Sequence, residues 1–318
     1  MSDKDMREVY TETLIEMAVV NEKICVMEAD LMRATGTNPF KEKFPERTFN
    51  VGVAEANMVG VSSGLSAGGK IPFAATFGCF AARRTFDQFF ISANYAQQNV
   101  KLVGTDPGVS AAFNGGTHMP FEDTGLMRCI PNLVIFEPSD TVSLKKLLKQ
   151  SADHKGSTYM RLQRKGKNEH YSENDDIVLG KGNVLKGGDD VTIIASGYIM
   201  VPEALGAAEM LSEVGISAAV IDMHTVKPLD KNLILKYAKK TGALVVCENH
   251  QKACGLFAAV SEMLAEEFPT PVQAVAVEDQ FGQVGTLGYL QEFYGLTAKN
   301  IVAKAKKVLE RKQITAGV

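Results

Sequence analysis

The sequence predicts an α/β protein with two domains, each a mainly parallel sheet flanked by helices. Short apolar runs bounded by Gly, Pro and Asp alternate with segments of helical period along most of the chain. Strands that alternate with helices in this way indicate βαβ units. The length of 318 residues is sufficient for two domains that each bury a hydrophobic core.

The first predicted domain covers residues 1–165. Gly68 and Gly69 stop its small-residue helix, and Asp140 is the expected N-cap of a further helix near the end of the domain. The expected elements are, in order, helix Met6–Val19, strand Ile24–Met27, strand Thr48–Val53, helix Ala54–Ala67, strand Ile71–Ala75, helix Ala82–Asn94, strand Val100–Gly104 and strand Leu133–Phe136.

Residues 166–190 are predicted to form a linker, because this stretch is polar, rich in Gly and poor in apolar periodicity. We expect it to include a hairpin at the entry to the second domain, which covers residues 191–318. The expected strands of that domain are Val191–Ala195, Ala218–Asp222, Ala243–Cys247 and Val272–Val277, and its expected helices are Val201–Glu213, Asp230–Thr241, Leu256–Glu267 and Ala298–Lys312.

The composition argues against several classes of protein. The net charge is −3 and the basic residues are dispersed, so no nucleic-acid surface is predicted. The polar N-terminus lacks the apolar core of a signal peptide, and no apolar run approaches the roughly 20 residues that span a bilayer. Five cysteines without a Cys-x-x-Cys pair or a metal-ligand cluster favour a cytoplasmic protein with free thiols and no metal site of its own.

Several stretches resemble one known family, in the order in which that family carries them. They are FNVGVAEANMVGVSSGLSAGG (49–69), AATFGCFAARRTFDQ (74–88), GGTHMPFEDTGLMRCIPNLVIFEPSD (115–140) and, in the second domain, IDMHTVKPLD (221–230). Over nearly its whole length the chain resembles the pyrimidine-binding and C-terminal domains of thiamine-diphosphate-dependent transketolases. 1-Deoxyxylulose-5-phosphate synthase and the pyruvate dehydrogenase beta subunit are similar to the same two domains.

The resemblance also draws attention to a missing part. Transketolases bind Mg²⁺ and the diphosphate of the cofactor with a Gly-Asp-Gly loop and a later Asn, in a third domain that precedes these two. Here the only Gly-Gly-Asp, Gly187 to Asp189, lies in the predicted linker. We therefore expect a split enzyme in which an N-terminal-half subunit supplies the Mg²⁺ and diphosphate site. Two copies of each subunit would form a heterotetramer (α2β2) with its sites at subunit interfaces.

Glu55 is the expected catalytic carboxyl group and also a cofactor ligand. It stands where a predicted strand becomes a helix, and α/β proteins build their sites in such places. In the family, a glutamate of this motif exchanges a proton with ring nitrogen N1′ of the pyrimidine, which prepares the removal of the C2 proton. Without the motif, a glutamate in the first turn would be explained by the helix dipole alone.

Four further side chains are expected near the cofactor. By resemblance Phe80 is the ring that stacks on the pyrimidine and Phe77 its neighbour, although core packing would also explain both rings. Asp30, in MEADL, matches a family segment at the cofactor or at the boundary between subunits, and a helix cap is its alternative role. Arg83 stands where many transketolases carry an aromatic residue. It either reaches a cofactor or substrate anion or is simply solvated.

His118 is expected to contact the substrate and to take part in catalysis. It lies in a glycine-rich stretch that resembles the family's GxTHQ-type motif, with Met119 in place of the usual Gln. An imidazole both donates and accepts hydrogen bonds, which suits the hydroxyl groups of a sugar. A surface histidine without function is the alternative.

Three arginines are candidates for binding an anionic group of the substrate, because guanidinium forks suit bidentate contacts with phosphate. Arg164 aligns with the family's arginine after the last strand of this domain, and Arg7 aligns with one on the first helix. Arg161 competes with Arg164 for the same role. Arg7, taken alone, would also be explained as a solvated residue.

Three positions that contact the sugar in the family depart from its pattern. Asp106 stands where familiar transketolases have His, Asn114 where they have Asp, and Ala34 where a phosphate-loop Ser is usual. Sites that hydrogen-bond particular hydroxyl groups reject analogues that leave buried polar groups unpaired. We therefore predict a branched, deoxy or otherwise modified ketose with an anionic tail near Arg164. The alternative is ordinary xylulose 5-phosphate of the pentose phosphate reactions.

The expected function is transfer of a two-carbon ketol unit from a ketose, usually phosphorylated, to an aldose. By resemblance the nucleophile is C2 of the thiamine, so no side chain of this chain attacks the substrate. The beta subunit of a 2-oxoacid dehydrogenase, which shares both domains, is a second possibility. A non-catalytic regulatory or scaffold subunit is a third, but a scaffold has no need of Glu55, Phe80 and His118 together.

Overall fold

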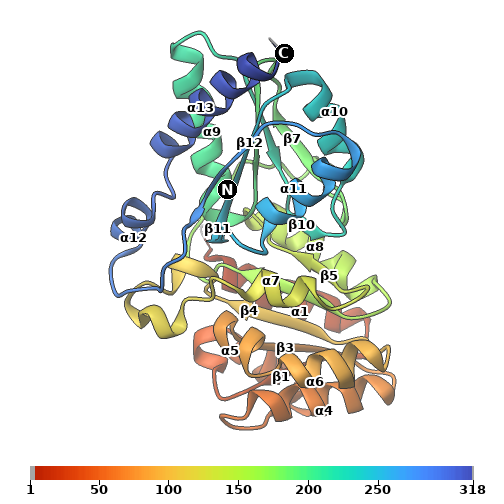
Figure 1. The fold of residues 1–318 in the computed structure, drawn as a ribbon. Coiled ribbons are helices and arrows are strands. Elements are labelled where there is room, and N and C mark those ends of the chain that lie inside the picture. Colours follow the sequence, from red (N-terminus) through yellow and green to blue (C-terminus); the bar gives the residue numbers. More distant parts are fainter. Residues whose placement is uncertain (1–3, 317–318) are drawn as a thin grey trace.

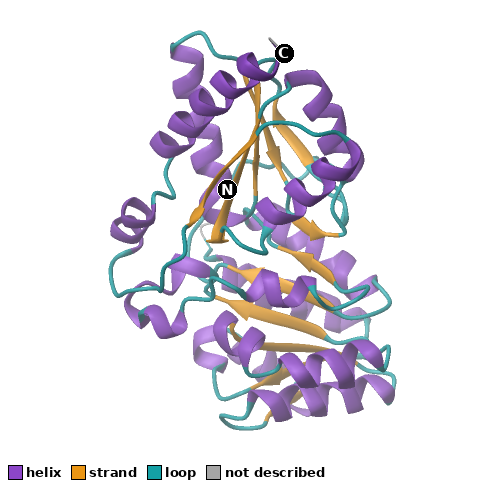
Figure 2. Ribbon diagram, in the orientation of Figure 1, coloured by secondary structure: helices purple, strands orange, loops and turns teal. Residues whose placement is uncertain are grey.

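A computed structural model describes residues 4–316 and contains two sheets with helices packed on their faces (Figures 1 and 2). The N-terminal part of the chain forms the lower half of the view in Figure 1, and the C-terminal part forms the upper half. Within each sheet most neighbouring strands are parallel. The predicted fold class is therefore confirmed.

The first sheet has seven strands in the order β10-β5-β6-β4-β3-β1-β2. The strands are β1 (Ile24–Glu28), β2 (Thr48–Asn50), β3 (Ile71–Phe77), β4 (Lys101–Thr105), β5 (Val134–Phe136), β6 (Thr158–Leu162) and β10 (Thr225–Lys227). Every residue of β1, β4 and β6 is buried. Continuous burial is expected of central parallel strands, because helices cover both faces of such a sheet.

Helices and short helical turns surround this first sheet. The helix α8 shows why one of them begins where it does: the Asp140 carboxylate accepts a hydrogen bond from the Ser143 amide at 2.7 Å, so the predicted N-cap is confirmed. The helical segments are α1 (Met6–Val20), α2 (Met32–Thr35), α3 (Asn38–Lys43), η1 (Pro45–Arg47), α4 (Glu55–Ala67), α5 (Gly78–Arg83), α6 (Phe86–Gln88), η2 (Phe89–Tyr95), η3 (Gly108–Asn114), η4 (Gly116–His118), α7 (Asp123–Arg128) and α8 (Thr141–Asp153).

The second sheet has five strands in the order β12-β11-β8-β9-β7. They are β7 (Asn183–Lys186), β8 (Val191–Ala195), β9 (Ala218–Asp222), β11 (Leu244–Gln251) and β12 (Val272–Val277). The helices α9 (Gly197–Glu213), α10 (Lys231–Thr241), α11 (Leu256–Glu267), α12 (Leu287–Tyr294) and α13 (Ala298–Ala316) complete this half. No helix among residues 4–316 is long and apolar enough to cross a membrane.

The second half of the chain contributes one strand to the first sheet, which the sequence did not indicate. The strand β10 comes from the second half of the chain, yet it pairs antiparallel with β5 at the edge of the first sheet. The predicted entry hairpin is not formed. The strand β7 lies at the edge of the second sheet and pairs antiparallel with β9, its neighbour there, and not with β8, the next strand along the chain. One hydrophobic cluster contains Met27 and Tyr159 of the first half and Ile194 and Val246 of the second. The two sheets therefore share a packed core, while the boundaries of the predicted domains stay a prediction.

One predicted helix of the first half is wrong. The stretch Ala82–Asn94 was expected to be continuous, but the structure divides it between α5, α6 and the π-helical segment η2. Arg84 and Thr85 form a turn that separates α5 from α6. Apolar periodicity does not show such a break. The helix expected over Val201–Glu213 forms but begins earlier, at Gly197.

Candidate active site

The carboxyl ends of five neighbouring strands bring the predicted site residues to one edge of the first sheet. Asp30 follows β1, Glu55 follows the loop after β2, Phe77 ends β3, Asp106 follows β4, and Arg164 follows β6. Parallel strands present their carboxyl ends on the same side, and this side is where α/β proteins bind their ligands. Residues distant in sequence are therefore assembled at this edge by the sheet itself.

Glu55 is the first residue of α4, and its side chain is only 4% exposed. Nη1 of Arg84 lies 3.1 Å from one of its carboxylate oxygens and 3.3 Å from the other. The same guanidinium group lies over the ring of Phe80, 4.1 Å from the ring centroid. Arg84 thus links the predicted pyrimidine-binding carboxylate to the predicted stacking ring. The sequence analysis missed this residue, although its position four residues after Phe80 on a helical motif was a usable signal.

Three rings form a contiguous group beside Glu55 and Arg84. The centroids of Phe77 and Phe80 are 6.0 Å apart. The imidazole of His118 meets both rings edge-on, at 5.2 Å from Phe80 and 5.9 Å from Phe77. Nδ1 of His118 lies 2.9 Å from the hydroxyl group of Thr117, which leaves Nε2 as the nitrogen available to a ligand. Aromatic edges and faces of this kind suit a flat heterocycle.

A cluster of charged groups continues the site beyond Phe77. The guanidinium carbon of Arg164 lies 5.0 Å from the centroid of Phe77. Asp106 holds Arg164 through two contacts, Nε to Oδ1 at 2.7 Å and Nη2 to Oδ2 at 2.5 Å. Arg164 and Arg7 both point an Nη1 group at the carbonyl oxygen of Ala34, at 3.5 and 3.4 Å. The structure therefore brings together four of the residues predicted around the sugar: Arg7, Ala34, Asp106 and Arg164.

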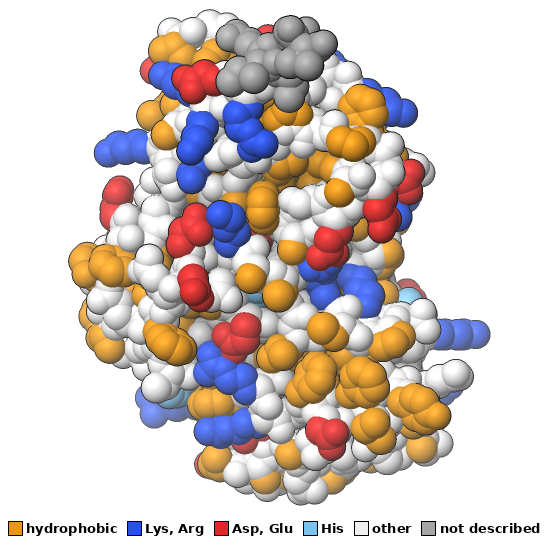
Figure 3. Space-filling view, in the orientation of Figure 1, with side chains coloured by type: hydrophobic (Ala, Val, Ile, Leu, Met, Phe, Trp, Pro, Cys, Tyr) orange, Lys and Arg blue, Asp and Glu red, His pale blue; other side chains and the backbone are white. Residues whose placement is uncertain are grey.

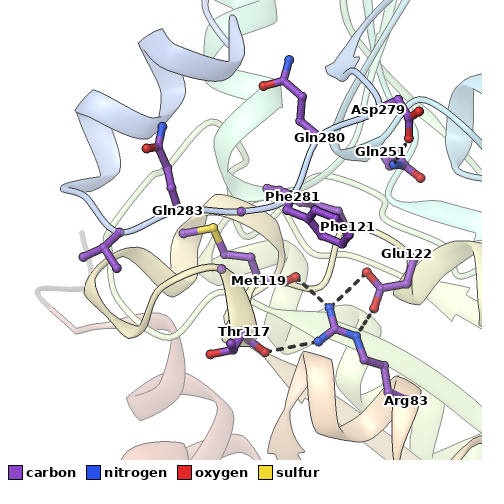
Figure 4. A pocket seen from close by; sticks show the side chains of 13 residues that line it. Arg83, Thr117, Met119, Phe121, Glu122, Gln251, Asp279, Gln280, Phe281 and Gln283 are labelled. Atoms are coloured by element: carbon purple, nitrogen blue, oxygen red, sulfur yellow. Dashed lines mark hydrogen bonds and ion pairs between the residues drawn. The ribbon is translucent and has the colours of Figure 1, made fainter.

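Arg83 has its partners in the loop that carries His118. It forms an ion pair with Glu122 and donates to the carbonyl oxygens of Thr117, at 3.2 Å, and Met119, at 3.1 Å (Figure 4). The alternative of a simply solvated residue is thus wrong. These contacts hold the loop in place on both sides of His118. A direct contact of Arg83 with the cofactor stays a prediction.

A cavity of about 890 Å³ lies between this loop and residues 279–284 of the second half (Figure 4). Phe281 stands at its mouth with 99% of its side chain exposed. The two walls approach closely at Gly116, where a Cβ atom would lie 2.1 Å from the carbonyl oxygen of Gly282. Only glycine permits this approach. The C-terminal half therefore supplies one wall next to the loop that carries His118.

Two predicted residues lie at the rim of the site. Asp30 adopts a positive φ of 62°. Its amide donates to Oδ1 of Asn50, and the same oxygen accepts from the amide of Gly52 in the loop that leads to Glu55. Asn114 ends η3 and is exposed. The roles predicted for Asp30 and Asn114 stay predictions.

The prediction that Arg161 binds an anionic group of the substrate is wrong. Its side chain is 1% exposed, and each of its three guanidinium nitrogens donates a hydrogen bond inside the protein. Nε donates to Asp123 at 2.8 Å, Nη1 to Glu137 at 2.6 Å, and Nη2 to the carbonyl oxygen of Asn249 at 2.9 Å. Asn249 belongs to β11 of the second sheet, so Arg161 ties the two halves together. Arg164, just beyond the strand, is the arginine that faces the site.

Glu28 is a buried carboxyl group that the sequence analysis did not single out. It ends β1 and is 0% exposed, and one of its oxygens accepts from the hydroxyl groups of Thr35 and Thr37, each at 2.7 Å. Its other oxygen is buried with no hydrogen-bond partner among the described residues. Burial raises the pKa of Glu28 from 4.5 to about 7, although the two threonine hydroxyl groups oppose the shift.

The raised pKa of Glu28 predicts a pH-dependent stability. The folded state binds this proton more tightly than the unfolded state, so stabilisation is complete below pH 4.5 and is lost as the pH rises through about 7. Between pH 4.5 and 8 the wild type should lose about 3 kcal/mol relative to Glu28→Gln. Urea unfolding across this range measures the difference. The exposed Glu22→Gln is the matched control, and parallel pH profiles of wild type and Glu28→Gln would contradict the prediction.

The geometry fits the pyrimidine end of thiamine diphosphate. A buried carboxylate suits contact with a ring nitrogen, and Arg84 connects it to the group of rings formed by Phe77, Phe80 and His118. Within residues 4–316, no group of three or more His, Cys, Asp or Glu side chains is arranged to hold a metal ion.

The chain belongs to the transketolase family. Residues 2–168 match the model described as "Transketolase, pyrimidine binding domain", and residues 180–301 match "Transketolase, C-terminal domain". Members of this family depend on thiamine diphosphate, in agreement with the fit of the site to the pyrimidine.

Three proteins that this chain matches along nearly their whole length are described as transketolase subunits or as a split gene transketolase. It is 48% identical to the 6-deoxy-6-sulfo-D-fructose transketolase subunit SqwH of Clostridium sp. (strain MSTE9), covering 96% of this chain and 95% of that one. It is 34% identical to one subunit of the apulose-4-phosphate transketolase of Phocaeicola vulgatus, covering 96% and 97%. A solved structure described as a split gene transketolase, inactive beta4 tetramer, superposes with a TM-score of 0.90 at 44% identity, covering 97% and 99%.

Proposed function

We propose that this protein is the beta-type subunit of a split transketolase that transfers a two-carbon ketol unit from a ketose with an anionic tail to an aldose. The observation that carries the proposal is the unbroken series of contacts from Glu55 to Arg7. It runs through Arg84 and Phe80, past His118 and Phe77, and through Arg164 to the carbonyl oxygen of Ala34. One end of the series suits the pyrimidine of the cofactor, and the other suits an anion.

Thiamine diphosphate, when bound, supplies the nucleophilic carbon of the reaction. Glu55 is proposed to hold or exchange a proton at N1′ of the pyrimidine, with Phe80 and Phe77 packed beside that ring. His118 then has its Nε2 free to hydrogen-bond a hydroxyl group of the sugar. The guanidinium groups of Arg164 and Arg7 anchor the far end of the donor and so orient it toward the reacting end.

The diphosphate and Mg²⁺ are proposed to bind on a separate N-terminal-half subunit, in an assembly with two copies of each subunit. Hydrophobic side chains gather on the molecular surface over α4 and α6 (Figure 3). Val53, Val61, Ile91 and Tyr95 are among the exposed large hydrophobic residues of this part of the chain, with exposures of 74%, 37%, 51% and 80%. Exposed apolar patches mark interaction sites. Because Val53 lies two residues before Glu55, a partner that docks there would border the site.

The donor is proposed to be a modified ketose, with 6-deoxy-6-sulfo-D-fructose as the first candidate. The support is the 48% identity to the subunit whose name carries that substrate. The replacement of a histidine by Asp106 in the anion-binding part of the site also separates this chain from ordinary transketolases.

The purified chain alone is expected to show no ketol transfer and only weak binding of thiamine diphosphate. The physical reason is that the metal and diphosphate contacts, which supply much of the binding energy, are missing. Mixing with the diphosphate-binding subunit should restore transfer, and the assembly should elute as a heterotetramer. Coupled assays of each subunit and of the mixture, together with light scattering, measure both effects. Sustained turnover by this chain alone, free of contaminating partner, would refute the proposal.

A further inference from the structure

The anion-binding end of the site contains the carboxylate of Asp106 together with the guanidinium groups of Arg164 and Arg7. Asp106 occupies the Nε and Nη2 edge of Arg164 with both carboxylate oxygens, at 2.7 and 2.5 Å. Its side chain is 5% exposed, and that of Arg164 is 16% exposed. This ion pair is therefore shielded from water and weakly screened, unlike an ion pair on the open surface.

The charges of this end add up to one positive charge. Arg7 and Arg164 contribute two positive charges and Asp106 one negative charge. Lys165 also acts on Asp106, but it is exposed and its effect is screened by solvent. Burial raises the pKa of Asp106, while Arg164, Lys165 and Arg7 oppose the shift. With a histidine at this position, the same end would carry two positive charges or more.

We propose that Asp106 is a specificity-determining residue that makes the site prefer a donor with a singly charged tail, such as a sulfonate, over one with a doubly charged phosphate. The inference rests on the proposed function and specifies its substrate class. A phosphate monoester carries about −1.5 to −2 charges at pH 7, whereas a sulfonate carries a single charge at every pH of interest. Only the single charge matches the net charge of this end of the site.

The geometry explains how the discrimination works. An anion that approaches Arg164 finds the Nε and Nη2 edge already taken. Its partners are therefore the N–H groups of Arg164 Nη1 and of the Arg7 guanidinium that are left beside their long contacts with the Ala34 carbonyl oxygen. A second negative charge on the ligand lies near the Asp106 carboxylate and is repelled by it. In a shielded site, one unit of charge at such separations changes affinity by about tenfold or more.

The backbone at Asp106 allows a clean test. Its φ is 57°, a conformation in which Asp, Asn and His are enriched among residues other than Gly. Asp106→Asn therefore keeps the shape and the backbone preference. It removes the charge and one of the two acceptor oxygens that face Arg164. Asp106→His restores the family pattern. The exposed Asp176→Asn removes the same charge from the predicted linker and serves as the matched control.

The experiment compares two donors of the same shape, 6-deoxy-6-sulfofructose and its phosphonate isostere, with the assembled enzyme. For the wild type and Asp176→Asn, kcat/KM should favour the sulfonate. In Asp106→Asn the ratio of the two kcat/KM values should shift toward the phosphonate by about tenfold. Lowering the pH until the phosphonate carries one charge should also shift the ratio of the wild-type kcat/KM values toward the phosphonate.

The dissociation constants of both donors with the assembly lacking thiamine diphosphate give a second readout, because no chemistry occurs there. The ratio of these constants should shift in parallel. If Asp106→Asn weakens the binding of both donors equally, Asp106 merely positions Arg164. An unchanged ratio of the two dissociation constants would therefore overturn the inference. Absence of ketol transfer from either donor in the wild type would instead refute the proposed function, and the binding ratio would still decide the role of Asp106.

Discussion

Glu55→Gln is expected to lower the rate of cofactor activation by about 10²–10⁴-fold while the fold and the subunit assembly stay intact. The amide has the shape of the carboxylate, but it cannot exchange a proton with N1′ of the pyrimidine. The side chain is 4% exposed, so water does not readily replace the missing group. Deuterium exchange at C2 of the cofactor bound to the assembled enzyme measures the effect directly.

Two control variants separate the carboxyl group from its surroundings. Arg84→Met removes the ion-pair partner of Glu55 and keeps the carboxyl group. It should therefore lower the rate of deuterium exchange at C2 less than Glu55→Gln does. Glu42→Gln changes an exposed glutamate of α3 and should have no effect. Exchange at the wild-type rate in Glu55→Gln, with cofactor bound, would show that another group activates the cofactor.

Arg161→Met is expected to lower the free energy of unfolding by about 3–5 kcal/mol. The substitution keeps much of the buried volume but leaves Asp123 and Glu137 as buried carboxyl groups without their cation. It also removes the hydrogen bond to the carbonyl oxygen of Asn249 in the second sheet. Denaturant unfolding followed by circular dichroism measures the loss.

The matched control for Arg161 is an ion pair on the surface. Lys149 pairs with Glu16 at 3.0 Å, with the two side chains 44% and 50% exposed. Lys149→Ala should therefore cost only about 0–1 kcal/mol. A loss in Arg161→Met no larger than in Lys149→Ala would mean that the buried charges find other partners or change protonation at little cost.

Several features of this protein could be predicted from the sequence because they depend on local patterns. Short apolar runs bounded by Gly, Pro and Asp located most of the strands, and segments of helical period located the longer helices. Asp140 was placed as an N-cap. The short strand β10 was not predicted, because three residues carry no periodicity and its pairing with β5 is made across the chain. The break of the predicted helix at Arg84 and Thr85 was missed because apolar periodicity does not show it.

The candidate site divides in the same way. The motif around Glu55 and the resemblance of the neighbouring stretches identified Glu55, Phe77, Phe80 and His118 as one set before any geometry was known. The structure places these rings beside one another, in contact through Arg84 with the carboxylate. Arg84 itself was overlooked although it stands four residues after Phe80 in the same motif, because its ion pair with Glu55 is made across 29 positions of the chain.

What the sequence by itself determined is the fold class, the family and the residue types that the chemistry needs, since these are written in local periodicity and in short motifs. Only the tertiary structure decided between Arg161 and Arg164, which are three positions apart. Arg161 lies within β6 and is enclosed by Asp123, Glu137 and the second sheet, while Arg164 lies beyond the strand and meets Asp106. Their partners are 88 positions away along the chain for Arg161 and Asn249, and 130 positions away for Arg164 and Ala34. Burial and the pairing of charges depend on such long-range contacts, which sequence spacing does not reveal.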